Sequence, residues 1–143
     1  MKKFEFSLQK MQRYKQQILD KEKALLAALQ SKRDKIKAEI EDLELFLVEQ
    51  SRKLQGKQMQ GMSAADLAGH NFIVQNTRTR LEALHIELLN AEKEVEEQRK
   101  IVLQASQEVK SIDKLEEKKL EEYHLEASRA ENEERMEMLR MKK

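Results

Sequence analysis

The stretch GKQMQGMSAADL, residues 56–67, decides the fold because it holds two of the chain's three Gly residues, and Gly69 follows two positions later. Gly is the main helix breaker in a chain of 143 residues that has no Pro. Ser63 is a favoured helix N-cap residue, and Asp66 completes a weaker form of the capping box. We therefore expect one helix to stop at about residue 56 and a second helix to start at about residue 64.

After this stretch, apolar residues recur in alternating steps of three and four, the heptad pattern of a coiled coil. Eleven of the fourteen positions are apolar. We call such a line of positions, predicted to face the other helix, a seam. The seam of the second helix comprises Leu67, His70, Val74, Thr77, Leu81, Leu84, Leu88, Ala91, Val95, Gln98, Val102, Ala105, Val109 and Ile112.

The first helix shows a less regular pattern, with a phase shift predicted around Ile36, where two steps of four follow each other. Facing residues of a hairpin have a nearly constant sum of position numbers. Leu54 and Leu67 give 121, and Leu8 and Ile112 give 120, so these pairs are predicted to face each other. The predicted seam of the first helix comprises Leu8, Met11, Lys15, Ile18, Glu22, Leu25, Leu29, Lys32, Ile36, Ile40, Leu43, Leu47, Gln50 and Leu54.

Composition supports the same fold class. Charged residues make up 38% of the chain and aromatic residues 4%, so it can bury a narrow seam but not a wide core. We predict an all-α protein: a long antiparallel two-helix coiled-coil hairpin with a C-terminal helical overhang. A single domain spans 1–143, with helix 1 over about 5–55, a turn over about 56–63 and helix 2 over about 64–140.

The overhang comprises residues 113–143, where the strict seam ends although the sequence still favours helix. Its apolar residues have no predicted partner within the chain, which suggests a docking surface, whereas the alternative is a frayed tail. These residues are Leu115, Leu120, Tyr123, Leu125, Met136, Met138, Leu139 and Met141.

Residues that could carry chemistry are sparse. Two Glu-x-x-His pairs, Glu82 with His85 and Glu121 with His124, have the spacing of di-iron ligands, but their separation prevents them from sharing a metal. His70 is interpreted as a polar seam residue that fixes register, with a pH switch as the alternative. No phosphate loop or nucleophile motif is present, so we predict no enzyme activity, no cofactor, no metal and no nucleic-acid binding.

The longest apolar run is ALLAAL, residues 24–29, so no membrane insertion is expected, and no signal peptide is recognised. The absence of Cys fits a reducing compartment, and we expect a cytoplasmic protein. Residues 1–37 hold eleven Lys or Arg against four Asp or Glu. This excess can attract acidic surfaces or anionic lipid headgroups, or it can simply be a solvated helix face.

Several motifs in order resemble the FliJ family of flagellar type III export proteins. They are the opening F-x-F-x-L-x-x-M from Phe4 to Met11, the central GMSAADL, and EVKSIDKLEEKK followed by a tail rich in Glu and Met. The resemblance implies a stalk-like coiled coil that associates with the membrane-bound export apparatus and supports motility and chemotaxis. The implied partners are the export ATPase hexamer and its regulator, the cytoplasmic domain of the export gate, and export chaperones. The alternative is a generic coiled-coil scaffold unrelated to secretion.

Two partner surfaces are predicted. The basic start around Lys2, Lys3, Lys10 and Arg13 is expected to enter the ATPase ring together with the overhang, which includes Tyr123, Met136 and Leu139. A surface for the export gate is expected on the first turns of helix 2, outside the seam. It comprises Phe72, Ile73, Asn76 and Arg80, and the alternative is that Phe72 folds back to plug the end of the hairpin.

Overall fold

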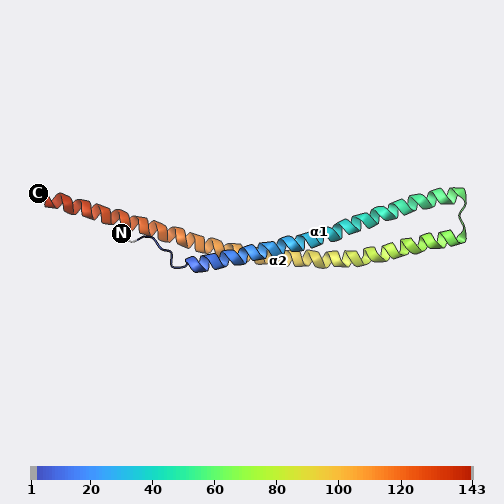
Figure 1. Cartoon of the computed structure of the whole chain (residues 1–143), viewed down its shortest axis with the longest axis horizontal. Coiled ribbons are helices and arrows are strands. Elements are labelled where there is room, and N and C mark those ends of the chain that lie inside the picture. Colours follow the sequence, from blue (N-terminus) through green and yellow to red (C-terminus); the bar gives the residue numbers. More distant parts are fainter. Residues whose placement is uncertain (1–2, 143) are drawn as a thin grey trace. The chain divides into compact units, whose positions relative to one another are not determined.

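A computed structural model describes residues 3–142 and contains two helices, α1 from Gln9 to Gln60 and α2 from Ala64 to Met141 (Figure 1). Regular structure within the described residues is entirely helical, so the predicted all-α helical hairpin is confirmed. Lys2, part of the predicted basic start, lies outside the described residues. The prediction that 1–143 acts as a single domain stays a prediction.

The turn is shorter than expected, because α1 continues through Gly56 and ends at Gln60. One Gly in a helix costs only about 1 kcal/mol, and the residues that follow it are good helix formers. Gly61 stops the helix: its φ of 91° lies in the left-handed region that ends many helices. The predicted cap is confirmed, since the backbone N–H of Asp66 donates to Ser63 Oγ at 3.1 Å.

The chain forms two compact units, each of which contains a segment of α1 and a segment of α2. Unit 2 comprises residues 24–100 and includes the turn. Its core includes an apolar cluster that contains Leu84, whose side chain is fully buried, and Val95 is buried as well. The cluster comprises Ile36, Ile40, Leu81, Leu84 and Ala91, with Leu43, Leu47 and Leu88 packed against it.

The seam predicted for α2 is confirmed by burial. Thirteen of its fourteen positions are buried or half-buried, and Leu67, next to the turn, is the exposed one. The seam holds polar residues as well: Thr77 is buried and donates its hydroxyl to the backbone oxygen of Ile73 at 2.8 Å. Gln98, with an exposure of only 5%, is buried too. The heptad pattern therefore identified the inner face of α2 correctly.

The seam predicted for α1 is partly wrong. Met11, Leu25 and Lys32 are exposed. Their neighbours Gln12, Leu26 and Arg33 are half-buried in their place, and Leu19 is more deeply buried than Ile18. With these changes the steps of three and four run without interruption, so the predicted phase shift does not exist. The observed seam begins with Leu8, which directly precedes α1, and continues with Gln12, Lys15, Leu19, Glu22, Leu26, Leu29, Arg33, Ile36, Ile40, Leu43, Leu47, Gln50 and Leu54.

Unit 1 comprises residues 1–23 and 101–143. Leu19 packs in one cluster with Ala105 and Val109, and Val102 packs against this cluster. Ala105 is the middle one of these three α2 positions, so Leu19 lies opposite it, and the two position numbers add to 124.

This sum corrects the register expected for unit 1, where Leu8 was predicted to face Ile112. Gln12 Nε2 instead donates to Asp113 Oδ1 at 2.8 Å, so Gln12 is the α1 residue that lies near Ile112. Leu8 therefore lies one helical turn farther along α2. The predicted pairing of Leu54 with Leu67, in unit 2, stays a prediction.

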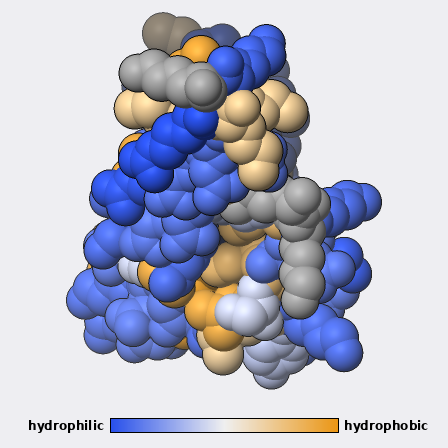
Figure 2. All heavy atoms as spheres, turned by 90° about the vertical axis from the view of Figure 1, so that its left-hand side faces the viewer, coloured by the Kyte–Doolittle hydropathy of each residue, from blue (hydrophilic) through white to orange (hydrophobic). Residues whose placement is uncertain are grey.

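The surface is strongly polar, as the composition requires. Figure 2 shows the face on which the C-terminal end of α2 lies: hydrophilic side chains cover most of it, and hydrophobic side chains emerge between them as small patches. The buried apolar residues are confined to the lines along which the helical segments meet.

Candidate partner-binding surfaces

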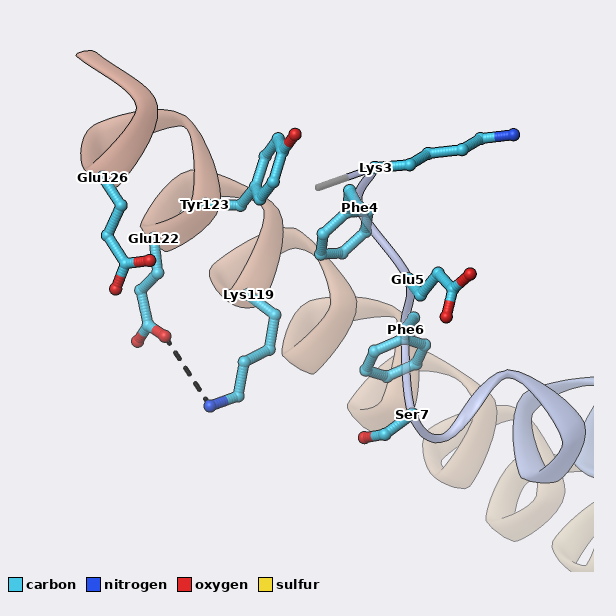
Figure 3. Close-up of a pocket in the computed structure, with 9 residues that line it drawn as sticks. All are labelled: Lys3, Phe4, Glu5, Phe6, Ser7, Lys119, Glu122, Tyr123 and Glu126. Atoms are coloured by element: carbon cyan, nitrogen blue, oxygen red, sulfur yellow. Dashed lines mark ion pairs between the residues drawn. The ribbon is translucent and has the colours of Figure 1, made fainter. Parts of the chain in front are cut away.

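Residues Lys3–Leu8, which we call the N-terminal strap, form no helix and lie against α2 in unit 1 (Figure 3). The ring centroids of Phe4 and Tyr123 are 5.5 Å apart and the rings are tilted by 53°. Phe6 points toward α2 as well, and both Phe side chains are half-buried. The strap therefore covers part of the α2 surface that α1 does not reach, because α1 begins only at Gln9.

The strap corrects the predicted overhang. Leu120 and Tyr123 were expected to have no partner within the chain, but both are half-buried. All described residues from Ser128 onward are exposed, so the bare part of α2 begins about there rather than at residue 113. The missed signal in the sequence is the alternation of Phe4 and Phe6, which suits an extended segment that turns one face to a helix.

The strap is packed loosely. A cavity of about 610 Å³ lies beside it, lined by the strap, Lys119, Tyr123 and the carboxylates of Glu122 and Glu126. A second cavity of about 620 Å³ is lined by the strap together with Gln9 and Glu116. Lys119 Nζ pairs with Glu122 at 3.6 Å across one turn of α2, so these charges form part of the rim (Figure 3).

The bare end of α2, residues 128–141, carries the predicted site residues Met136 and Leu139. They are 61% and 60% exposed and lie three positions apart, on one helix face. A shallow cavity of about 480 Å³ runs along this part, between Arg129 and Arg140. Exposed apolar groups with charged neighbours at helical spacing form a surface suited to another helix.

The predicted basic residues Lys10 and Arg13 are exposed near the start of α1. No ion pair joins either of them to another described residue. Lys15, farther along, is different: its Nζ contacts Glu108 Oε2 at 2.9 Å across the two helical segments. This hydrogen bond, together with the positive charge of Lys15, lowers the pKa of Glu108. Lys15 therefore belongs to the interface within unit 1, while Lys10 and Arg13 remain available to a partner.

In unit 2 the four residues predicted to bind the gate are exposed on the first turns of α2. Phe72 is 66% and Ile73 44% exposed. Arg80 is engaged within the unit: its Nη2 contacts Glu39 Oε1 at 3.1 Å and its Nη1 contacts Glu87 Oε1 at 3.7 Å. The alternative in which Phe72 plugs the end of the hairpin does not fit its exposure. Their role in binding a partner stays a prediction.

No group of three or more metal-ligating side chains lies together among residues 3–142. Both Glu-x-x-His pairs lie exposed on α2, and the His124 ring contacts the edge of the adjacent Tyr123 ring. His70 is half-buried, in agreement with its place in the α2 seam. Neither described helix has an apolar stretch that could cross a membrane.

The fold thus defines an α-helical hairpin of the coiled-coil class, with apolar groups exposed on the outer faces of its helices. Comparison with protein families then identifies the family: the family model described as Flagellar FliJ protein matches residues 4–139. The chain belongs to the FliJ family and is therefore a component of flagellar protein export. Searches of curated proteins and of solved structures found no match.

Proposed function

We propose that the chain is a stalk-like coiled coil that links the export ATPase ring to the export gate and assists the escort of export chaperones. It works without catalysis, in the cytoplasm, and associates with the membrane-bound export apparatus. Membership of the FliJ family supports this role. The observation that carries it is the bare α2 end in unit 1, where Met136 and Leu139 are exposed on one face.

The ATPase ring is assigned to this end of unit 1. Apolar side chains of this size can lie exposed to water in the free protein. They contribute favourable binding free energy when a partner covers them. The exposed Lys10 and Arg13 belong to the same unit and add positive charge that an acidic partner surface would attract. The ATPase regulator and the chaperones are proposed partners without an assigned surface.

The export gate is assigned to unit 2, to Phe72 and Ile73 with the polar Asn76 beside them. An exposed aromatic group with polar neighbours has the composition of a binding hot spot. Arg80 lies on the same part of α2, and its pairing with Glu39 and Glu87 fixes the position of its guanidinium group.

Three double variants test both assignments on the full chain. Met136→Ala with Leu139→Ala is expected to abolish stimulation of ATP hydrolysis by the export ATPase and to leave gate binding intact. Phe72→Ala with Ile73→Ala is expected to have the opposite effect. Ile86→Ala with Leu89→Ala is the matched control, because these residues are 62% and 60% exposed on α2 with the same spacing.

Melting curves by circular dichroism should be similar for all three variants, because each removes exposed side chains. Full ATPase stimulation by the Met136 and Leu139 variant would contradict the assignment of the bare α2 end. If the unaltered chain binds neither the ATPase nor the gate, the proposed function is wrong and the generic scaffold becomes the better reading.

A further inference from the structure

The inner face of α2 in unit 1 has two kinds of cover. Up to about Asp113 it is covered by helix α1, which contacts it through Gln12. Farther along it is covered by the strap, which contacts it through Phe4. Tyr123 of α2 packs against Phe4 of the strap. It is half-buried together with Leu120 and Ala127, at spacings of three and four, and we call these three residues the α2 stripe. From Ser128 onward nothing described covers the helix.

The strap is a poor match for the surface beneath it. A helix whose apolar residues follow steps of three and four presents a stripe that fits another helix. An extended segment alternates its side chains every second residue and cannot follow that spacing. The two cavities beside the strap, of about 610 and 620 Å³, are a consequence of this mismatch. Phe4 and Phe6 remain partly exposed for the same reason.

We propose that the strap is a displaceable cover and that a helix of the export ATPase replaces it on the α2 stripe. The inference rests on the proposed function and adds a regulatory step to it. On the bare end, Met138 and Met141 are 68% and 87% exposed and lie on the same side of α2 as the α2 stripe, so a partner bound to them extends onto the stripe once the strap leaves. The free protein thereby keeps the α2 stripe covered until the ATPase is present.

Charge indicates what kind of helix replaces the strap. Residues 113–127 of α2 hold six Asp or Glu against three Lys, and Glu122 and Glu126 line the cavity beside the strap. An incoming helix with basic residues along the borders of its apolar face complements this surface. The strap itself brings Lys3 to the same cavity. A second copy of the same α2 surface would be acidic against acidic, and it is therefore a poor occupant.

The test fixes the strap to α2 with a covalent crosslink. The chain has no Cys, so Ser7→Cys with Lys119→Cys, two residues that line the same cavity, gives a unique pair of thiols. A short crosslinker with an internal disulfide joins them and is cleaved by a reductant. We expect the crosslinked protein to bind and stimulate the ATPase weakly, and the reductant to restore both. Ser7→Cys alone, treated in the same way, is the control.

A release variant tests the opposite direction. Phe4→Ala with Phe6→Ala removes the Phe4–Tyr123 ring contact and the second aromatic ring that points toward α2, and we expect ATPase binding to become roughly tenfold tighter. Equal stimulation by the crosslinked and the reduced protein would overturn the inference, and so would weaker binding by the release variant at unchanged melting temperature. If the uncrosslinked protein fails to stimulate the ATPase at all, the proposed function itself is wrong, and this inference falls with it.

Discussion

Units 1 and 2 are both built from antiparallel helical segments, but different interactions hold them together. Unit 2 has an apolar cluster of five buried residues with three more packed against it. Unit 1 has a cluster of three with one more, and its interface also includes the Lys15–Glu108 and Gln12–Asp113 contacts and the ring contact of the strap. Apolar burial is concentrated in the unit that contains the turn.

This difference has an energetic meaning. A fully buried Leu contributes about 1.5 to 3 kcal/mol relative to an exposed one, whereas ion pairs with access to water contribute much less. Unit 2 should therefore open rarely, and unit 1 should open more often at its strap end. Regions that exchange partners are commonly drawn from the less stable parts of a protein. We therefore expect the strap end of unit 1, rather than the core of unit 2, to exchange its internal contacts for contacts with a partner.

The largest expected effect comes from a charge in the core of unit 2. Leu84→Asp should destabilise the protein by about 3 to 5 kcal/mol, because it buries a carboxylate where Leu84 is fully enclosed. Most domains have a stability of about 5 to 15 kcal/mol, so helicity at room temperature should fall visibly. Ile86→Asp, at an exposed position two residues along, is the matched control and should change stability by about 0.5 kcal/mol. Equal melting of the two variants in circular dichroism would refute the apolar core of unit 2.

A smaller effect should distinguish the turn from the helix beside it. Gly61→Ala should destabilise by about 1 kcal/mol, because an L side chain at a φ of 91° is strained although the space is open. Gly56→Ala should stabilise by about 0.5 to 1 kcal/mol, since Gly56 lies within α1 and an added methyl group meets nothing within 4 Å. Denaturant titrations measure both changes. The same sign for both would mean that α1 does not end at Gln60.

The smallest expected effect is on how the stability of the protein depends on pH, through an ion pair in unit 1. Because the hydrogen bond and charge of Lys15 lower the pKa of Glu108 in the folded state, the pair stabilises the protein above the unfolded carboxyl pKa. This contribution is lost as the pH falls through the folded pKa. Glu108→Gln should therefore reduce the melting temperature slightly at about pH 7, with the difference vanishing at about pH 3. Glu131→Gln, an exposed position on the bare α2 end, should show no such convergence.

The sequence predicted α2 better than α1, and the reason lies in the seam residues. In α2 the positions that face α1 are mostly Leu, Val and Ala, so the heptads are visible. In α1 the true seam holds Gln12, Lys15 and Glu22, while Met11 and Leu25 lie beside it. Long polar side chains can occupy a two-helix seam because their aliphatic parts pack and their polar ends reach its edge, as Lys15 reaches Glu108.

For the candidate site residues, the sequence indicated which side chains are exposed, but not which of them form ion pairs or other contacts within the chain. Phe72 and Ile73 follow directly from the α2 heptads, because both lie between the seam positions His70 and Val74. The pairing of Arg80 with Glu39 depends on the register between the two helical segments of unit 2 and on the conformations of both side chains, which heptad positions alone do not specify. The strap was missed because its one signal, the alternation of Phe4 and Phe6, covers too few positions to establish a period.

The uninterrupted heptads of α1 have a consequence for how proteins of this design can change in length. Seven residues added to α1 before Gln60 and seven added to α2 after Ala64 would insert complete layers and preserve every facing pair on either side. Each such step would lengthen a helix by about 10 Å. Seven residues added to one helix alone would shift all later pairs, including Lys15 with Glu108. Relatives that span different distances should therefore differ by matched insertions on the two sides of the turn.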